Sequence, residues 1–471
     1  MSQANIPAPT HVVTSFLLRR DQGEDRVLLV RRSDRVRTYR GAWGAVSGYL
    51  EPGVTPLEQV RTEMREEAGV DERSAMLLSS GEPLAVDDDA QGLHWVVHPF
   101  LFLLTTPDAV RTDWEATDHR WVRPDEVASY QTVPKLLEAL AEVYPPEASH
   151  DAPDLPEPLR AAIERIRDDR DHGASWLAHE AAAALAEASV PGALDNDDER
   201  LERLRQAARA LATTRPSMAA LSNTVARIWF ATRSAGGTGG EASTASARLR
   251  ALHDAAEAQL RAWDEASAGI YRHARPLLGG ELFTHSRSGT VEDVLLRYAA
   301  EQREQGKGDA LPALWLTESR PGGEGIALAR ALAPAGWRIT LIADAAVGTF
   351  VREAAAVVVG ADSIRADGGV VNKIGTYPLA LAAQRAGVPM YVLTESVKIA
   401  APSAPLVLEA MDPRELLPEP VPGISARNPY FELTPAELVT ATITERGHLS
   451  QQDIAAIARD AERDLAFLVS G

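Results

Sequence analysis

The chain has 471 residues, a formal net charge of −19 at pH 7, 45% hydrophobic residues and no cysteine. This length predicts two or three domains, and the lack of cysteine excludes disulfides, thiolate metal sites and cysteine nucleophiles. The negative charge argues against broad nucleic-acid binding, and the absence of an apolar run of roughly 18 residues argues against a membrane span, so we expect small phosphorylated ligands as partners.

The first part of the chain predicts a small α/β domain over residues 1–143. Its start lacks a basic flank and an apolar core, so no export signal is visible and we expect a cytoplasmic protein. The patterns predict a helix that begins near Pro56 and strands at 11–17, 26–31, 94–104 and 121–122. Residues 144–158 are rich in proline and acidic residues, which predicts a linker.

The helix of this first domain carries three glutamates at the spacing of one helical face. Glu63, Glu66 and Glu67 stand at i, i+3 and i+4, which places their carboxylates side by side. Such a cluster is usually a solvated acidic face. Here a predicted strand pair precedes it, Gly48 stands 15 residues before Glu63, and Gly69 and Val70 end the helix. Three like charges repel unless a cation neutralises them, and oxygen ligands suit Mg²⁺ or Mn²⁺.

The segment from Gly48 to Val70, GYLEPGVTPLEQVRTEMREEAGV, resembles the Nudix box. The resemblance implies an α/β/α sandwich that hydrolyses a pyrophosphate bond in a nucleoside-diphosphate-linked metabolite. It also implies that Glu63, Glu66 and Glu67 are catalytic and that, with Gly48, they form the metal site. Mg²⁺ or Mn²⁺ would bridge the substrate phosphates and lower the pKa of an attacking water.

Two positions of the box differ from the pattern of the family. Val54 occupies the position of the first glutamate, and Thr62 occupies that of an arginine that normally orients a neighbouring carboxylate. A domain that binds its ligand without turnover is therefore the alternative. Trp43, and Trp114 together with Glu115 and Asp118, are candidates to line a base or ribose site, although such tryptophans are more often part of the core.

After the linker, residues 159–278 predict a helical subdomain and residues 279–471 a Rossmann-like one. Leu201, Leu204, Ala208 and Leu211 have the spacing of a buried helix face. Beyond them, helical patterns alternate with five strand-like runs, which predicts a doubly wound parallel sheet. These runs are 281–285, 313–318, 338–344, 355–360 and 389–394.

Two turns that follow predicted strands have the composition of phosphate sites. Arg320, Gly322 and Gly323 follow one strand and open a helix, where free backbone N–H groups and a guanidinium can bind an anion. Asn372 and Lys373 follow another strand and offer an amide and one of only four lysines in the chain. Glycine-rich turns often bind nothing, but the rare lysine favours a phosphate site.

Residues 159–471 resemble the family that joins the regulatory subunits of translation initiation factor 2B, ribose-1,5-bisphosphate isomerase and methylthioribose-1-phosphate isomerase. The resemblance rests on segments such as THSRSGTV (284–291), TESRPGGEG (317–325) and GADSIRADGGVVNKIGTY (360–377). It implies a homo-oligomer and a site in which Asp362 and Ser286 take the places of the aspartate and cysteine that catalyse isomerisation. A serine hydroxyl is a much weaker acid than a thiol.

We therefore expect a Mg²⁺-dependent Nudix pyrophosphohydrolase fused to a domain that binds a phosphorylated sugar or nucleotide. One alternative is a non-catalytic, ligand-sensing protein of the initiation factor 2B type, which Val54, Thr62 and Ser286 favour. Another is an active sugar-phosphate isomerase that uses Asp362. In each case Arg320, Asp362, Asn372 and Lys373 would form one pocket, with Ser286 facing it.

Overall fold

The computed structural model describes residues 10–21, 24–71, 74–88, 93–104, 110–144, 155–169, 173–190, 196–215, 218–235, 244–307, 311–404, 406, 408, 411–419 and 421–470. The chain forms two compact units. The first comprises Met1–Leu155, Ser403–Val407 and Ala466–Gly471, and the second comprises Pro156–Pro402 and Leu408–Leu465. The predicted linker includes this boundary, although its residues 145–154 lie outside the described part.

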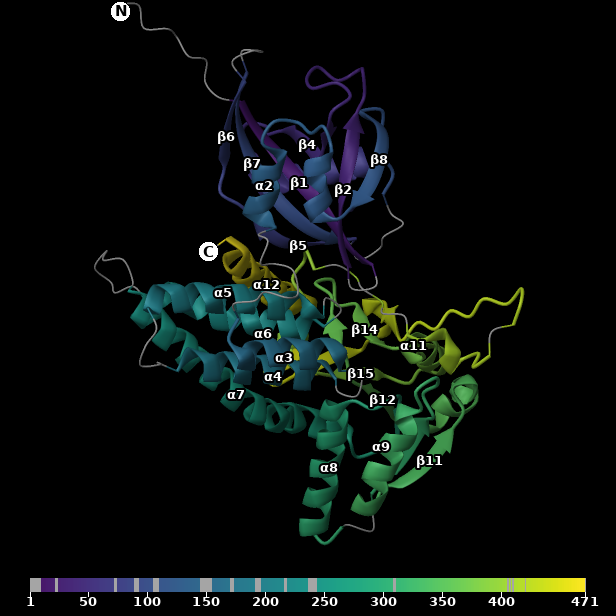
Figure 1. Ribbon diagram of the computed structural model, residues 1–471. Helices are drawn as coiled ribbons and strands as arrows, with labels where there is room; N and C mark the ends of the chain where they lie inside the picture. Colours follow the sequence, from purple (N-terminus) through teal and green to yellow (C-terminus); the bar gives the residue numbers. More distant parts are fainter. Residues whose placement is uncertain are drawn as a thin grey trace, which may run out of the picture. The chain divides into compact units, whose positions relative to one another are not determined.

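The first unit is built on an eight-stranded sheet (Figure 1). The main path of the sheet has the order β3-β2-β1-β7-β5, with β4 beside β1, β6 beside β7 and β8 beside β2. Only β1 and β7 pair in parallel among these described strands. The strands are β1 (Thr10–Asp21), β2 (Glu24–Arg32), β3 (Trp43–Gly44), β4 (Val46–Tyr49), β5 (Ala75–Ser80), β6 (Leu84–Asp88), β7 (Leu93–Leu104) and β8 (Ala116–Val122).

Two helices, α1 (Pro56–Ala68) and α2 (Leu136–Val143), cover opposite faces of this sheet. Side chains of β1 alternate between the faces, because successive residues of a strand point to opposite sides. Val13 and Leu17 pack in the core beneath α1, whereas Phe16 and Leu18 pack in the core beneath α2. This confirms the predicted α/β/α sandwich, and the predicted strands and the helix at Pro56 are all present.

The second unit begins with a helical part. Its helices are α3 (Glu157–Asp168), α4 (Ala174–Ser189), α5 (Asp197–Thr214), α6 (Ala219–Phe230) and α7 (Ala245–Ala274). The predicted apolar face of α5 is buried, with Leu201 8%, Leu204 1%, Ala208 0% and Leu211 0% exposed. Helix α7 runs for 30 residues and contacts α4, α5 and α6 as well as the sheet part of the unit.

A seven-stranded sheet follows, in the order β11-β10-β9-β12-β15-β17-β18. All neighbours are parallel except β17 and β18. The strands are β9 (Leu282–Thr284), β10 (Ala313–Thr317), β11 (Arg338–Ile342), β12 (Ala356–Val359), β15 (Met390–Leu393), β17 (Ala441–Thr444) and β18 (Gly447–Leu449). The five predicted strands are present. Not predicted were β17, β18 and a small antiparallel sheet of β13 (Ser363–Ile364), β14 (Val370–Lys373) and β16 (Phe431–Thr434).

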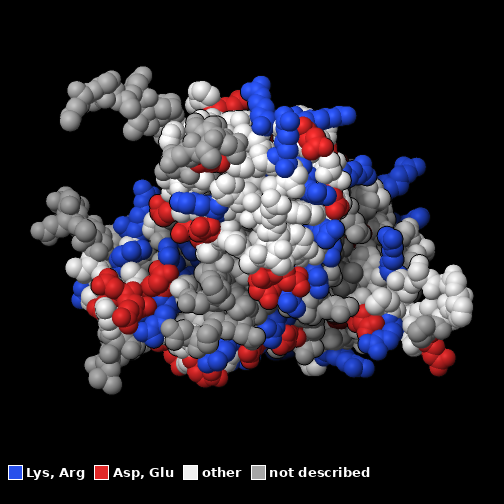
Figure 2. Space-filling model, turned by 45° about the horizontal axis from the view of Figure 1, so that its top comes forward, with Lys and Arg blue, Asp and Glu red and all other residues white. Residues whose placement is uncertain are grey.

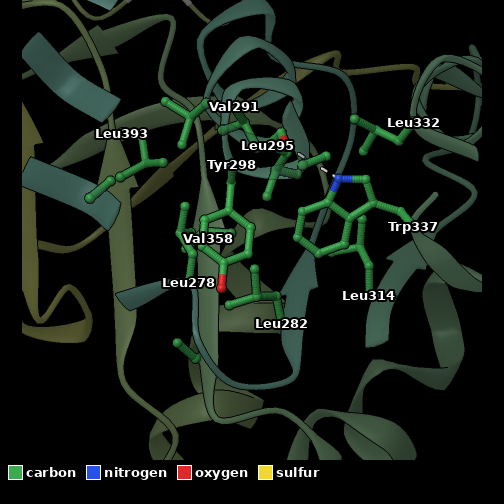
Figure 3. Packing of buried hydrophobic residues seen from close by; sticks show 14 of the residues in the cluster. Leu278, Leu282, Val291, Leu295, Tyr298, Leu314, Leu332, Trp337, Val358 and Leu393 are labelled. Atoms are coloured by element: carbon green, nitrogen blue, oxygen red, sulfur yellow. Dashed lines mark hydrogen bonds between the residues drawn. The ribbon is translucent and has the colours of Figure 1, made fainter. Parts of the chain in front are cut away.

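Helices pack on both faces of the seven-stranded sheet, as a doubly wound fold requires. One core joins the sheet to α7, α8 (Gly289–Glu304) and α9 (Glu324–Leu332), and the other joins it to α10 (Val347–Phe350), α11 (Thr376–Ala386) and α12 (Gln451–Ser470). Figure 3 shows the first core, where the rings of Tyr298 and Trp337 lie 6.0 Å apart. The Trp337 indole N–H donates to the Leu295 carbonyl at 3.2 Å.

The strand order places a crevice at the centre of this sheet. From β9 the chain first adds β10 and β11 on one side and then returns to add β12 and β15 on the other. Open α/β sheets bind ligands where the order reverses in this way, beyond the carboxyl ends of the strands. The residues that follow β9 and β12 are therefore placed beside a binding crevice.

Figure 2 shows basic and acidic side chains interspersed over the face in view, although acidic residues outnumber basic ones 67 to 48 in the whole chain. In the described part of the chain, no helix is long and apolar enough to cross a membrane.

Candidate functional sites

The three predicted metal-site glutamates lie on α1, whose two ends are fixed by local signals. The Thr55 hydroxyl accepts a hydrogen bond from the Glu58 N–H, the Glu58 carboxylate accepts one from the Thr55 N–H, and Pro56 fills the first helical position. Gly69 ends the helix in the left-handed conformation, and its N–H donates to the Met64 carbonyl. These caps fix where the helix begins and ends, and Val60 and Met64 anchor it in the core against the sheet.

Gly48, the predicted partner of these glutamates, lies on β4 directly against Glu63. A Cβ at Gly48 would stand 1.9, 2.0 and 2.4 Å from the carboxyl atoms of Glu63, so any larger residue would displace this carboxylate from its position. Glu63 Oε1 also accepts a hydrogen bond from Gln59 Nε2 at 2.8 Å. Burial raises the pKa of Glu63; the Gln59 hydrogen bond opposes this effect, and the charge of Glu66 adds to it.

Glu67 lies in the most densely charged part of the site. Its Oε2 accepts a hydrogen bond from the Ser47 N–H at 3.3 Å. Burial raises the pKa of Glu67 to about 8, and the negative charges of Glu115, Glu63 and Asp113 contribute to the rise. Burial and the charge of Asp113 also raise the pKa of Glu115. Carboxyl groups that raise one another's pKa values form a site that a cation would stabilise.

The segment that carries Asp113 and Glu115 is joined to the end of α1. The Asp113 N–H donates to the Glu67 carbonyl at 3.2 Å, and the Glu115 carbonyl accepts from the Ser33 N–H at 2.7 Å. From the sequence, Glu115 was a candidate for a base or ribose contact and Asp113 was missed, because no spacing rule connects them to a helix more than forty residues earlier. The candidate Trp43 is a core residue, 9% exposed, whereas Trp114 is 56% exposed.

The donor set suits a hard divalent cation, because every ligand candidate is a carboxylate oxygen. Glu66 is exposed, and Glu63 and Glu67 are half-buried. Among the described residues, no three acidic or histidine side chains already surround a single cation position. The chemistry of the site therefore fits Mg²⁺ or Mn²⁺, and the choice of ligands stays a prediction.

The second unit contains a cavity of about 970 Å³ at the predicted crevice. Ser286 from the end of β9, Asp362 from the end of β12, and Asn372 and Lys373 from β14 line it together. The loops after β9 and β12 approach closely, since a Cβ at Gly360 would stand 2.2 Å from the Ser288 hydroxyl oxygen. Four of the predicted site residues therefore share one space.

Arg320, Gly322 and Gly323 are not among the described residues that line this cavity. Arg320 is exposed, and its backbone N–H donates to Asp344 Oδ2 at 2.6 Å, while the Ser319 N–H donates to Asp344 Oδ1 at 2.8 Å. The Asp344 carboxylate thus accepts hydrogen bonds from two backbone N–H groups of a turn that was expected to bind a phosphate. Among the described residues, Glu324 is the one from this turn and helix start that lines the cavity, so the turn adjoins the cavity through Glu324.

Lys373 is 5% exposed and has two partners that sequence reasoning missed. Its ammonium pairs with the Glu324 carboxylate and lies over the Tyr430 ring, 3.3 Å from the centroid. A Cβ at Gly322 would stand 2.5 Å from Glu324 Oε1, so the carboxylate packs against the glycine-rich turn. An anionic ligand that reaches Lys373 must compete with Glu324.

A second buried ion pair, between Glu395 and Lys398, also lines the cavity. Lys398 Nζ lies 3.1 Å from Glu395 Oε2, and the Thr290 and Ser175 hydroxyls donate to the two carboxylate oxygens at 2.9 and 3.3 Å. Burial raises the pKa of the Glu395 carboxyl, but the Lys398 charge and the hydrogen bonds outweigh burial and hold the pKa below its usual value. Because Ser175 and Thr290 begin α4 and α8, this carboxylate ties two helices together.

His285 holds the loop that carries Ser286. Its Nε2–H donates to the Ile374 carbonyl at 2.8 Å, and Nδ1 accepts from the Thr317 hydroxyl at 2.6 Å. Burial lowers the pKa of His285, so the ring is neutral at pH 7. Ser286 itself is in the left-handed region at φ 62°, where its N–H donates to the Ser319 hydroxyl at 2.7 Å.

The cavity also receives the first turn of α4, a feature that the sequence did not single out. Residues 173–176 line it, and Gly173 caps this 16-residue helix without a side-chain hydrogen bond. A helix N-terminus without a side-chain cap offers free N–H groups and a partial positive charge to an anion. His172, which precedes this turn, lies outside the described residues.

Each half of the chain matches a known protein family. Residues 170–451 match the family model of the initiation factor 2 subunit family, and residues 9–145 match that of the NUDIX domain. The ribose 1,5-bisphosphate isomerase of Archaeoglobus fulgidus is 34% identical over 299 residues, which is 62% of this chain and 89% of that protein.

A putative translation initiation factor eIF-2B subunit 2-like protein of Pyrococcus horikoshii is also 34% identical, over 62% of this chain and 96% of its own length. The crystal structure of translation initiation factor eIF-2B from Pyrococcus horikoshii OT3 superposes with a TM-score of 0.50 at 32% identity, over 63% of this chain and 98% of that one. The relatives thus include proteins named as isomerases and proteins named as initiation factors. The chain belongs to the initiation factor 2 subunit family and carries a NUDIX domain ahead of the family's shared part.

Proposed function

We propose that the NUDIX domain hydrolyses a pyrophosphate bond in a nucleoside-diphosphate-linked metabolite with the help of Mg²⁺ or Mn²⁺. The observation that carries the proposal is the carboxylate cluster around Glu67, whose pKa of about 8 reflects burial among other negative charges. Glu63, Glu66 and Glu67 would hold the ion beside Gly48. A bound divalent ion supplies positive charge to the phosphates and lowers the pKa of the attacking water.

The residues of the chain then have distinct parts in the reaction. Glu63, placed by Gly48 and Gln59, has the fixed position that a ligand needs. We assign Glu67 to take the proton of the attacking water, because its carboxylate lies among the acidic groups that would hold the ion. Water adds across the P–O–P bond, which yields a nucleoside monophosphate and a second phosphorylated product.

The experiment uses the full chain with Mn²⁺ or Mg²⁺ and a panel of nucleoside diphosphate sugars, dinucleotides and nucleoside triphosphates. We expect a nucleoside monophosphate to be released from at least one compound and EDTA to stop its release. If no compound in the panel is cleaved with either ion, the domain is a binding module and the proposal fails.

For the second unit we propose that the cavity binds a phosphorylated sugar. Lys373 and Lys398, two of only four lysines in the chain, are both buried there. Glu324 and Glu395 are their partners in this structure, and a phosphate would take the place of Glu324 beside Lys373. The first turn of α4 offers N–H groups to a phosphate in the same space. The cavity of about 970 Å³ is large enough for a sugar carrying two phosphates.

Binding without conversion fits this cavity better than isomerisation. Asp362 and Ser286 line the same space, as an isomerase would require of its base and acid. However, the chain has no cysteine, and a serine hydroxyl gives up its proton far less readily than a thiol. Both ring nitrogens of His285 are already hydrogen-bonded, to Thr317 and Ile374, so His285 does not replace the thiol as an acid.

Replacing Lys373 with alanine is expected to weaken the binding of ribose 1,5-bisphosphate roughly 10- to 150-fold, the range for loss of one charged hydrogen bond. Calorimetry measures the affinity, and product analysis of the same samples reveals any conversion. Lys307→Ala is the matched control, because Lys307 is exposed and does not line the cavity. Equal affinity in wild type and Lys373→Ala would contradict this placement of the phosphate, and ribulose bisphosphate in the wild-type sample would support the isomerase alternative.

A further inference from the structure

We propose that Gln59 is the positioning residue that aligns Glu63 for a divalent cation, a role for which Thr62 is not available. The inference rests on the proposed function of the NUDIX domain. It assigns to this domain a carboxylate support that is neutral rather than cationic.

Gln59 is fixed at both ends of its amide group. It lies on α1 one turn before Glu63 and is only 6% exposed. Its Nε2 donates to Glu63 Oε1 at 2.8 Å, and its Oε1 accepts from the Glu51 backbone N–H at 3.4 Å. The second contact ties the side chain to the loop between β4 and α1, which determines which end of the amide faces Glu63.

The hydrogen bonds of the Thr62 hydroxyl are made within its own helix and do not involve a carboxylate. Its Oγ1 donates to the Glu58 backbone carbonyl of its own helix at 3.3 Å and accepts from Arg65 Nη2 at 3.5 Å. A threonine hydroxyl in a helix commonly bonds in this way to the carbonyl four residues earlier. The residue beside Glu63 in the sequence is therefore engaged with the helix, and the donor to Glu63 comes from Gln59.

Gly48 and Gln59 together define where the Glu63 carboxylate can lie. The absence of a side chain at Gly48 opens the space for the carboxylate, and the Gln59 amide orients it within that space. Residues that orient a metal ligand from outside the coordination shell typically change metal affinity 10- to 100-fold when they are replaced. We expect an effect of this size for Gln59.

A neutral support has an electrostatic consequence. A guanidinium beside Glu63 would cancel part of its charge through a charge-assisted pair, whereas an amide aligns the carboxylate and leaves its full charge. Glu63 thus keeps its full electrostatic repulsion with Glu66 and Glu115. The cation itself must then supply the compensating charge.

The test measures Mn²⁺ binding to the full chain by calorimetry and by the electron paramagnetic resonance signal of the bound ion. Gln59→Met keeps the size and apolar contacts of the side chain but removes both hydrogen bonds. We expect it to weaken Mn²⁺ binding about 10- to 100-fold, whereas Thr62→Ala should leave the affinity within about twofold of wild type. Gln59→Asn, whose amide is one methylene too short to reach Glu63, serves as the second variant if Gln59→Met does not fold.

A double-mutant cycle separates positioning from a general loss of structure. If Gln59 acts through Glu63, adding Gln59→Met to Glu63→Gln should weaken Mn²⁺ binding no further. If the two losses multiply, or if the Gln59 variants bind as tightly as wild type, the inference is wrong. If wild type itself binds no Mn²⁺, the proposed function of the NUDIX domain fails instead, so the two failures are distinguishable.

Discussion

Replacing Glu67 with glutamine is expected to lower pyrophosphate hydrolysis by about 10²- to 10⁴-fold, the range for loss of a general base, and to weaken Mn²⁺ binding as well. The substitution keeps the size of the side chain and an oxygen that can accept from the Ser47 N–H. It removes the negative charge and the proton-accepting oxygen. Initial rates at saturating Mn²⁺ measure the loss of proton transfer apart from the loss of affinity.

The same substitution should increase the stability of the first unit when no divalent cation is bound. Burial raises the pKa of Glu67 to about 8 in the folded chain, from an ordinary value of 4.5. Between these values the folded state holds a proton that the unfolded state releases, so the free energy of unfolding falls as pH rises from about 4.5 to 8. Glutamine does not titrate, so Glu67→Gln lacks this fall in the free energy of unfolding. At pH 8 in EDTA, the first unit of the variant should melt at a higher temperature than that of wild type.

The pH dependence of cation binding follows from the same titration. Below pH 8 the Glu67 proton must leave before a cation can bind. Wild-type Mn²⁺ affinity should therefore rise as pH increases from 6 to 8 and level off above pH 8, whereas Glu67→Gln should lose this rise. Glu138→Gln, at an exposed position on α2, is the matched control. If Glu67→Gln retains wild-type turnover or the wild-type pH profile, Glu67 has been assigned the wrong part.

The glutamates of α1 were predictable because their relation is local. Glu63, Glu66 and Glu67 lie within a single helix, where spacing alone determines the face. The core face of α5 and the five predicted strands of the seven-stranded sheet were predictable for the same reason, since each follows from the pattern within one element. Gln59 is also local, but glutamine at a helix position carries no signal until Glu51 is placed beside it.

Contacts between distant segments could not be predicted in this way. Asp344 follows β11 and accepts from N–H groups of the turn that follows β10, a contact that exists only because the two strands are neighbours in the sheet. Glu324 and Lys373 are 49 residues apart and meet only in the folded cavity. A glycine-rich turn therefore showed that an anion could bind, but not that the protein itself supplies a carboxylate there.

Breaking the buried ion pair of Glu395 and Lys398 has the largest expected effect on stability. Replacing Lys398 with methionine is expected to destabilise the second unit by about 3–5 kcal/mol. The two side chains are only 11% and 6% exposed, so water would compensate only in part for the lost ammonium. The carboxylate would remain buried with hydroxyl partners alone, and the link that it makes between the first turns of α4 and α8 would carry an uncompensated charge.

Urea unfolding followed by far-ultraviolet circular dichroism at pH 7.5 measures this loss, and a double variant identifies its cause. Glu395→Gln combined with Lys398→Met removes both charges and should recover much of the stability, since exchanging a buried pair for neutral groups costs far less than leaving one charge alone. If the double variant is no more stable than Lys398→Met, the loss comes from packing of the lysine stem rather than from the stranded carboxylate.

The pH dependence of the single variant provides an independent check. In wild type the pKa of Glu395 is held below its usual value, so its contribution to stability is present above the ordinary pKa of 4.5 and is lost as pH falls through the lower, folded value. Without Lys398 burial dominates and raises that pKa, so the carboxyl group becomes neutral at a higher pH and no longer needs a partner. The difference in unfolding free energy between wild type and Lys398→Met should therefore be largest at pH 7.5 and shrink toward pH 4.5. A constant difference across this range would mean that the charge of Glu395 is not the cause.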